Sequence, residues 1–306
     1  MENSIIVVRM AVPAASPAPA SPAPGRPRDH GFHRLRVARV VHETADAASF
    51  VLDVPQELRD AFTYTAGQFC TFRATVSGSQ YLRCYSMSST PGVDDELQVT
   101  VKRVAGGVVS NWMIDALRPG DVIEVTCPAG VFCLRPDRDL AAFAGGSGIT
   151  PVFSLLKAAL VTTPRRAHLL YANRDGASVI FRGALDGLAT RYATRLRVGH
   201  HFDAEAGFVS VDEVRAVLAG TEDAECYLCG PQPFMDLVEE VLLNEGVPPE
   251  RVHMERFTPP DDAPVPGAAG AAPLPGAPLV PGAAQGTEVT IELDGRTGTV
   301  SHRAGT

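Results

Sequence analysis

Two patterns of apolar residues divide the chain. Between residues 31 and 136, apolar and polar residues alternate with period two, in stretches such as LRVARVV, SFVLDV, QFCTFRATV, ELQVTVKRV and DVIEVT. Period-two runs broken by Gly and Pro are typical of short antiparallel strands. We therefore expect a Greek-key antiparallel β-barrel over residues 31–136, interrupted by one helix over residues 108–117.

From residue 137 to residue 257 the pattern changes to strands that alternate with helices. Five short apolar runs (LAAFA, HLLYA, LRVGH, CYLC and VHMERF) are separated by stretches with helical spacing, among them PVFSLLKAALV and PFMDLVEEVLLNEG. Such alternation predicts an α/β domain with a doubly wound, five-stranded parallel sheet.

Two further segments are rich in proline. Residues 1–30 indicate a disordered N-terminal tail, and residues 258–286 indicate a Pro/Ala/Gly linker. Residues 287–306 alternate on both sides of Asp294-Gly295, which predicts a β-hairpin. Twenty residues cannot bury a core of their own.

Composition excludes several classes of protein. The net charge of −8 over 306 residues, without a basic run, argues against nucleic-acid binding. The most apolar stretch, 140–161, contains three glycines, Pro151 and Lys157, so no membrane span is expected. The six cysteines are scattered, which favours free thiols and a cytoplasmic location.

The segment AGGSGITP follows the first strand of the predicted parallel sheet. Gly145, Gly146 and Gly148 permit a sharp turn and close approach of a ligand. Thr150 is expected as the helix N-cap and Pro151 as the first helical residue. A helix N-terminus beside such a turn favours a pyrophosphate, although a tight strand-to-helix turn without a ligand explains the segment equally well.

The fourth strand of this sheet ends in LCGPQPFM. Cys229, Gly230 and Pro231 are expected at the carboxyl edge, where ligands of such sheets bind. Cys226 forms a CxxC with Cys229, but residues three apart in a strand point to opposite faces, so a metal or dithiol pair is not expected. The pair His200-His201 is interpreted as surface residues at the end of a strand.

Three stretches of the barrel carry polar groups with no obvious role in a strand. In RCYSMSST, Arg83 offers a bidentate clamp for a pyrophosphate, Tyr85 a ring face and Ser86 a hydroxyl. The stretch VTVKRV follows, and GGVVSNW then begins a helix at Gly107 and Ser110, a second anion-binding terminus. Each stretch alone is also consistent with an ordinary strand or helix start, but their order before a nucleotide-binding sheet favours a flavin site.

These motifs resemble the ferredoxin–NADP reductase superfamily of flavoproteins over residues 33–257. RCYS matches its R-x-Y-[ST] signature, GVVS its G-x-x-S, GGSGITP its nicotinamide-nucleotide turn and CGP its nicotinamide-proximal motif. The resemblance implies that Arg83 binds the FAD pyrophosphate, that Tyr85 stacks on the isoalloxazine, and that Ser86 lies near its N5 atom. It also implies that Cys229 lies beside the nicotinamide and that Glu255 and Phe257 border the flavin.

The expected site residues fall into three groups. The catalytic group is Ser86, Cys229, Glu255 and Phe257. The FAD-binding group is Arg83, Cys84, Tyr85, Ser86, Thr100, Val101, Lys102, Gly107, Val108, Val109, Ser110 and Thr150. The NAD(P)-binding group is Gly145, Gly146, Ser147, Gly148, Thr150, Pro151, Asn173, Arg174, Asp175, Cys229, Gly230 and Pro231. No metal ligands are expected.

Within the superfamily, SNW, FAGGSGITP, YANRD and CGP resemble the reductase components of 3-ketosteroid 9α-hydroxylase and phenylacetyl-CoA epoxidase type oxygenases. Those relatives carry a C-terminal [2Fe–2S] domain, and EVTIELDGRTGTV resembles its first hairpin. The C-x4-C-x2-C run that would hold the cluster does not occur here. We therefore expect a truncated ferredoxin-like domain and no [2Fe–2S] cluster in this chain.

The expected function is an NAD(P)H-dependent flavin oxidoreductase that passes electrons from NADH through FAD to an oxygenase component or ferredoxin. Hydride transfer would require Phe257 to move aside. A non-enzymatic FAD-binding electron-transfer or regulatory subunit and a free flavin reductase are the alternatives. NADPH remains the alternative coenzyme, because Arg174 would suit a 2′-phosphate and Asp175 a 2′-hydroxyl, with the two expected on opposite sides of the chain.

Overall fold

The computed structural model describes residues 31–221, 223–257, 287–293 and 296–302. The expected N-terminal tail and the Pro/Ala/Gly linker lie outside these residues. The described residues up to 257 belong to one compact unit, and the described residues from 287 onward belong to a second.

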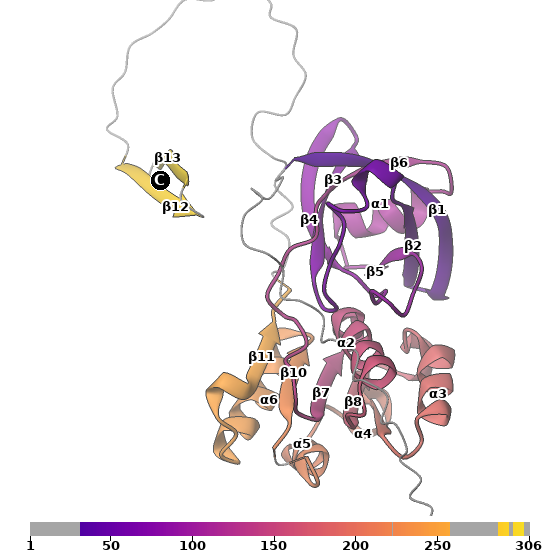
Figure 1. The fold of residues 1–306 in the computed structure, drawn as a ribbon, viewed down its shortest axis with the longest axis vertical. Coiled ribbons are helices and arrows are strands. Elements are labelled where there is room, and N and C mark those ends of the chain that lie inside the picture. Colours follow the sequence, from indigo (N-terminus) through magenta and orange to yellow (C-terminus); the bar gives the residue numbers. More distant parts are fainter. Residues whose placement is uncertain (1–30, 222, 258–286, 294–295, 303–306) are drawn as a thin grey trace, which may run out of the picture. The chain divides into compact units, whose positions relative to one another are not determined.

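The first half of the larger unit is an antiparallel six-stranded sheet, as the period-two alternation predicts (Figure 1). Its strands are β1 Phe32–Thr44, β2 Ala47–Asp53, β3 Phe69–Val76, β4 Ser79–Ser86, β5 Leu97–Lys102 and β6 Val122–Thr126, with a 3₁₀ turn η1 at Gln56–Leu58. They lie in the order β4-β3-β6-β1-β2-β5, and a bridge between Met87 and Val99 connects the two edges. The sheet thus curves around one apolar core, which includes Leu35, Phe50 and Phe72.

The single expected helix of the barrel is α1, Val108–Ala116, which ends one residue before the predicted limit because Leu117 is its C-cap. Val109, Met113 and Ile114 on its inner face are buried in the barrel core. A loop of five residues, 103–107, connects β5 to its N-terminus and keeps the end of β5 close to the first turn of α1.

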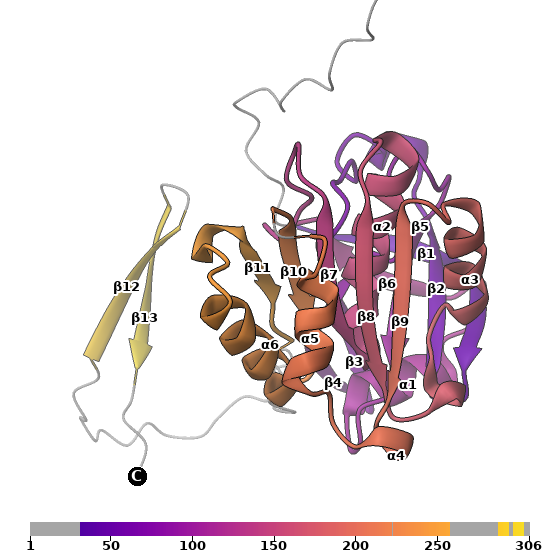
Figure 2. The same cartoon turned by 90° about the horizontal axis from the view of Figure 1, so that it is seen from below.

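The second half is the predicted α/β domain (Figure 2). Its helices and strands are β7 Leu140–Gly145, α2 Ile149–Thr162, β8 Ala167–Asn173, α3 Arg182–Arg191, β9 Leu196–Phe202, α4 Asp203–Ala206, α5 Val211–Leu218, β10 Glu225–Cys229, α6 Gln232–Asn244 and β11 Val252–Glu255, with 3₁₀ turns η2 Gly146–Gly148, η3 Gly176–Ser178 and η4 Pro249–Arg251. All of its strand pairs are parallel, in the order β11-β10-β7-β8-β9.

Helices cover both faces of this sheet, which explains why β7 is buried along its whole length. Residues of α2 and α3 belong to the core on one face, and residues of α5 and α6 to the core on the other. The strand order reverses between β7 and β10, and ligands of such sheets bind at this switch point, beyond the carboxyl ends of the strands. The GGSGITP and CGP turns both lie there.

The smaller unit contains two antiparallel strands, β12 Thr287–Leu293 and β13 Arg296–His302, with Leu293 opposite Arg296. Their interpretation as the start of a ferredoxin-like domain stays a prediction. In the described part of the chain, no helix combines the length and apolar character that a membrane crossing requires.

Candidate functional site: a pocket between the barrel and the nucleotide-binding turn

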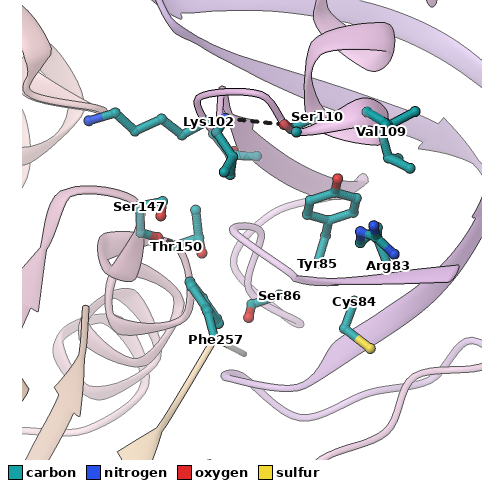
Figure 3. A pocket seen from close by; sticks show the side chains of 14 residues that line it. Arg83, Cys84, Tyr85, Ser86, Lys102, Val109, Ser110, Ser147, Thr150 and Phe257 are labelled. Carbon is teal, nitrogen blue, oxygen red and sulfur yellow. Dashed lines mark hydrogen bonds between the residues drawn. The ribbon is translucent and has the colours of Figure 1, made fainter. Parts of the chain in front are cut away.

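One pocket brings the barrel motifs to the first turn of the α/β domain (Figure 3). All residues expected to bind FAD line it except Val101. The lining residues are Arg83, Cys84, Tyr85, Ser86, Thr100, Lys102, Val104, Gly107, Val108, Val109, Ser110, Ser147, Thr150 and Phe257. Three stretches that are separate in sequence therefore converge on a single cavity.

The wall formed by β4 supplies a cation, a ring and a hydroxyl. The Tyr85 ring packs edge-to-face against Phe72, 5.4 Å between centroids, so the barrel core fixes its orientation. Burial raises the pKa of the Tyr85 phenol, which therefore stays neutral. The Arg83 guanidinium donates to the Leu82 carbonyl oxygen at 2.8 Å and remains half-buried at the pocket. Figure 3 shows Arg83 beside Tyr85.

The opposite wall comes from β5 and α1. The Thr100 hydroxyl lies 2.7 Å from the Ser49 hydroxyl and 2.8 Å from that of Ser88, and all three residues are buried. Val101, the next residue, points into the barrel core, so the expectation that it lines the site is wrong for its side chain. Successive side chains of a strand point to opposite faces, so Thr100 faces the pocket while Val101 faces the core.

The first turn of α1 forms one end of the pocket. Gly107 is its N-cap, and Val108, Val109 and Ser110 follow. The Ser110 hydroxyl accepts a hydrogen bond from the Val104 backbone N–H at 3.1 Å, which fixes the loop before α1 against the first turn of the helix. First-turn N–H groups have no acceptor within the helix, which suits an anionic ligand. Val104 was missed by sequence reasoning, because an exposed valine in a loop carries no signal.

The GGSGITP and CGP turns are packed against each other at the switch point. A Cβ on Gly148 would lie 2.0 Å from the Cys229 carbonyl oxygen, and one on Gly145 would lie 2.7 Å from the Pro231 ring. Gly146 has a φ of +53°, a left-handed conformation that favours glycine. Close packing of the two turns thus requires these glycines, and it brings Gly230 and Pro231 beside the helix start.

The expected start of α2 is wrong by two residues. The helix begins at Ile149 with Gly148 as N-cap, so Thr150 and Pro151 lie inside its first turn. The 3₁₀ turn η2 already bends the chain at Gly146, which lets the helix begin earlier. The Thr150 hydroxyl donates to the Ser147 carbonyl oxygen at 3.0 Å, and both residues line the pocket.

Ser86 and Glu255 connect the two domains at the pocket. The Ser86 hydroxyl donates to Oε2 of Glu255 at 3.2 Å. Burial raises the pKa of Glu255 to about 7, and the hydrogen bond from Ser86 lowers it in part. A carboxyl group that titrates near neutral pH can hold or release a proton under ordinary conditions.

Cys229 and Phe257 complete the expected catalytic group. Cys229 pairs with Glu255 in the parallel ladder between β10 and β11. It is fully buried, and burial raises the pKa of its thiol well above the usual value. Phe257 lines the pocket and is 40% exposed. Figure 3 shows it beside Thr150 and Ser86.

The loop after β8 differs from the expectation. Arg174 and Asp175 do not point to opposite sides, because Nε of Arg174 donates to Oδ2 of Asp175 at 3.0 Å. Asp175 caps the 3₁₀ turn η3, accepting from the Ser178 N–H, and this bend ends the alternation of the strand. Asn173 is buried, and within the described residues its amide has no hydrogen-bond partner.

Cys226 and Cys229 lie in the cores on opposite faces of the sheet, as the strand geometry predicts. All six cysteines belong to the described residues and none forms a disulfide there. The interpretation of His200-His201 as a surface pair is wrong for His201. This residue is buried, with Nδ1 2.6 Å from Oε1 of Glu213 in α5 and Nε2 2.7 Å from the Gly207 carbonyl oxygen.

The fold and the pocket define a class: a ferredoxin-reductase-like oxidoreductase with an FAD-binding barrel and an NAD-binding α/β domain. Comparison with family models agrees. Residues 34–133 match the oxidoreductase FAD-binding domain, and residues 143–240 match the oxidoreductase NAD-binding domain.

Curated relatives and solved structures extend this match. The chain is 47% identical over 226 residues to the ferredoxin reductase component of 3-ketosteroid-9-alpha-monooxygenase from Rhodococcus rhodochrous, covering 73% of this chain and 64% of that protein. It is 34% identical to one subunit of the 1,2-phenylacetyl-CoA epoxidase of Escherichia coli, covering 75% and 68%. The FAD/NAD-binding domain of a Vibrio cholerae nitric oxide dioxygenase superposes with a TM-score of 0.61 at 26% identity, covering 75% of this chain and all of that one.

The chain therefore belongs to the family of oxidoreductases that join an FAD-binding domain to an NAD-binding domain and that includes these oxygenase reductase components. It spans slightly less than two thirds of the length of the 3-ketosteroid monooxygenase reductases that it matches.

Proposed function

We propose that this chain is an NADH-dependent flavin reductase that delivers electrons to an oxygenase component or a ferredoxin. The observation that carries the proposal is the hydrogen bond between Ser86 and Glu255, made where the FAD-binding wall and the NAD-binding turn meet. The names of its relatives, reductases of oxygenase systems, support the same role.

The residues of the pocket fit FAD. Arg83 and the first turn of α1 would hold the pyrophosphate, because they offer a cation and free N–H groups at one cavity. The Tyr85 ring would stack on the isoalloxazine, and Lys102 and Thr100 would border it. When bound, FAD supplies the capacity to take a hydride and release electrons one at a time.

The residues at the switch point fit a nicotinamide coenzyme. The packed turns at Gly148 and Cys229 present the N-terminus of α2 to a pyrophosphate. The amide of Asn173, which makes no hydrogen bond to the described residues, lies at the carboxyl end of β8 and would offer a donor and an acceptor to the rest of the coenzyme. Phe257 covers the pocket from the carboxyl end of the sheet and would move aside to admit the nicotinamide.

The residues near the reacting rings hold and move a proton. Ser86 is held by its hydrogen bond to Glu255, whose pKa of about 7 lets the carboxyl group take up or release a proton at neutral pH. The Ser86 hydroxyl would relay that proton by accepting one as it gives up its own, and so stays neutral. The buried thiol of Cys229, a residue packed against Gly148, stays neutral and adds no charge near the site. No described residue needs to form a covalent bond to substrate.

An anaerobic spectrum tests the proposal. Purified protein should show bound flavin that bleaches on addition of NADH and recovers with ferricyanide. Flavin that stays oxidised with both NADH and NADPH would instead indicate a binding subunit. Flavin that separates from the protein on gel filtration would indicate a free flavin reductase.

Acceptor and location are part of the same proposal. We expect a cytoplasmic protein whose acceptor is an oxygenase component or ferredoxin, with no nucleic-acid partner. The chain as it stands should contain no [2Fe–2S] cluster, because the six cysteines lie between residues 70 and 229 without the C-x4-C-x2-C spacing.

A further inference from the structure

Helix α2 is fastened to the barrel by buried hydrogen bonds close to the pocket. The Ser154 hydroxyl donates to the Ser89 carbonyl oxygen at 2.6 Å, and the Thr90 hydroxyl donates to the Ser154 carbonyl oxygen at 3.0 Å. All three residues are almost completely buried. A buried hydroxyl is costly unless it is paired, so these bonds hold only while the two domains keep this spacing.

One turn further along α2, Lys157 makes an ion pair with Asp94 of the same barrel loop. The Lys157 side chain is only 12% exposed, and its ammonium lies 4.7 Å from the centroid of the Phe153 ring. Asp94 also accepts from the Thr90 N–H at 2.7 Å, which ties the ion pair to the hydrogen bonds. We call Ser89, Thr90, Asp94, Ser154 and Lys157 the clasp.

The barrel side of the clasp is itself rigid. The Ser89 hydroxyl lies 2.6 Å from the Tyr64 hydroxyl and accepts from the Gln98 N–H at 2.8 Å. The loop therefore cannot follow a displacement of α2 without breaking bonds inside the barrel.

The clasp connects the two walls between which a hydride would pass. Ser89 follows Ser86, the pocket residue of the flavin wall, by three positions, and Ser154 follows Thr150, the pocket residue of the coenzyme wall, by four. Figure 1 shows α2 on the side of the parallel sheet that faces the barrel. Any movement at Ser154 is passed directly to the helix start that faces the coenzyme.

We propose that Ser154 and Lys157 are positioning residues that set the separation between the bound flavin and the nicotinamide. The inference rests on the proposed function. Reactions between held groups are steeply sensitive to geometry, and a misplacement of about 1 Å can cost about 10²-fold in rate. A clasp of this kind would affect the rate of hydride transfer more than the binding of either cofactor.

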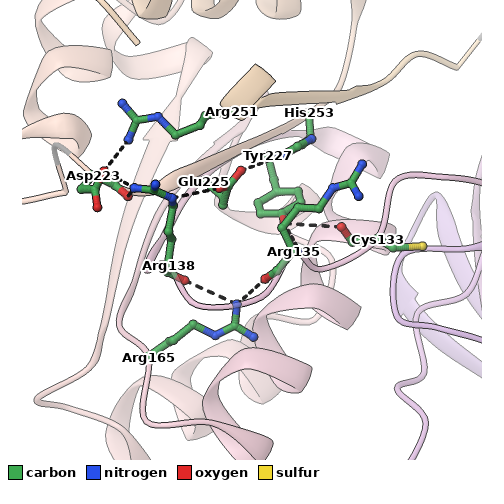
Figure 4. A network of polar contacts seen from close by, with 9 residues as sticks. All are labelled: Cys133, Arg135, Arg138, Arg165, Asp223, Glu225, Tyr227, Arg251 and His253. Carbon is green, nitrogen blue, oxygen red and sulfur yellow. Dashed lines mark hydrogen bonds and ion pairs between the residues drawn. The ribbon is translucent and has the colours of Figure 1, made fainter. Parts of the chain in front are cut away.

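The chain offers a matched control at the far end of the parallel sheet (Figure 4). Arg251 is 16% exposed and pairs with Asp223 at 3.0 Å, near the amino ends of the strands. Arg251→Met therefore removes the contacts of a basic side chain about as buried as Lys157, although its partner Asp223 is 84% exposed, and it leaves the clasp untouched. In the same network, the Tyr227 hydroxyl accepts from the Arg135 N–H at 2.7 Å, which fixes the chain between the two domains independently.

The experiment is anaerobic stopped-flow reduction of the bound flavin by NADH in the full chain. Lys157→Met and Ser154→Ala should lower the limiting reduction rate by about tenfold or more, with FAD content unchanged and the apparent Kd for NADH changed much less. Lys157→Arg, which can still pair with Asp94, should restore most of the rate. In Arg251→Met, NADH should reduce the bound flavin at the wild-type rate, even if this variant lowers Tm as much as the clasp variants do.

Unchanged reduction rates in both clasp variants, or an equal loss in Arg251→Met, would overturn the inference. If Ser154→Ala does not fold, Lys157→Met and Asp94→Asn decide, because Asp94 lies on a partly exposed loop. Wild-type flavin that NADH does not reduce would refute the proposed function instead, so the two failures are distinguishable.

Discussion

The Ser86 hydroxyl donates a hydrogen bond of 3.2 Å to the Glu255 carboxyl group, although the two residues are 169 positions apart. Ser86 is the last residue of β4 in the barrel, and Glu255 is the last residue of β11 in the α/β domain. The bond therefore exists only when both domains are folded and in place. It also places a titratable carboxyl group next to Ser86, which lines the pocket where the two sets of cofactor motifs meet.

The raised pKa of Glu255 predicts a pH dependence of stability. Its pKa rises from 4.5 to about 7 on folding, so the folded protein holds the proton more tightly than the unfolded chain. The contribution of this group to the free energy of unfolding is greatest below pH 4.5, falls as the pH rises toward 7, and is flat above. The total change is on the order of 3 kcal/mol.

Urea unfolding of wild type and Glu255→Gln at about pH 5 and about pH 8, on either side of the raised pKa, measures this effect. The substituted amide is uncharged and can still accept from Ser86, so the variant should lose much less stability between the two pH values than the wild type. Parallel pH profiles for both proteins would show that Glu255 is not the group concerned.

We predict that Arg83 holds the FAD. Arg83→Ala should purify colourless or lose its flavin on dialysis, because a charge-assisted hydrogen bond to the pyrophosphate contributes about 1.5–3 kcal/mol. Arg83→Lys keeps the charge but not the planar guanidinium, so its affinity for FAD should lie between those of the wild type and Arg83→Ala. Arg36→Ala on the exposed face of β1 serves as control. Retention of FAD by Arg83→Ala with wild-type affinity would contradict the pyrophosphate role.

We predict that Cys229 assists hydride transfer as a neutral thiol. Burial raises its pKa, so a thiol reagent at neutral pH should label the exposed Cys84 and leave Cys229 unmodified. Cys229→Ala should slow flavin reduction without changing FAD content, since the residue adjoins both Gly148 and Glu255. Cys226 lies on the opposite face of the sheet, so Cys226→Ala should not slow flavin reduction. Equal slowing by both substitutions would favour a dithiol role.

The fold could be predicted from periodicity, but several details of the site could not. The antiparallel sheet follows from period two and the parallel sheet from the alternation of strands and helices, whereas Val101, expected at the site, lies in the core. The start of α2 was misplaced because the 3₁₀ turn at Gly146 has no distinct sequence signal. His201 is buried against Glu213 of α5 and the Gly207 carbonyl oxygen, tertiary contacts that a dipeptide cannot reveal.

The contacts of the clasp could not be predicted from the sequence either. The sequence gives no sign that the hydroxyl residues Ser89, Thr90 and Ser154 are paired. A lysine such as Lys157 in a helix is usually a surface charge. Only the docking of α2 on the barrel makes them partners. Hydrogen bonds between domains depend on distances that neither domain's own pattern determines.

The coenzyme preference is predicted from the charges after β8 and β9. Arg174, the cation suited to a 2′-phosphate, already pairs with Asp175. The Ala204 N–H donates to the Arg174 carbonyl oxygen at 2.9 Å, which places the first turn of α4, with Asp203 and Glu205, beside this loop. Carboxylates so placed repel a phosphate, whereas a 2′-hydroxyl can donate to one of them.

We therefore expect NADH to exceed NADPH in kcat/KM by about tenfold, which corresponds to about 1.4 kcal/mol. Asp175→Ala should narrow the difference, because it leaves the Arg174 guanidinium available to a 2′-phosphate. Arg174→Ala should leave NADH turnover nearly unchanged and weaken NADPH further. Steady-state kinetics with ferricyanide and both nucleotides decide the matter: a roughly tenfold advantage for NADPH that Arg174→Ala abolishes would assign Arg174 to the phosphate and reverse the preference argued from Asp175.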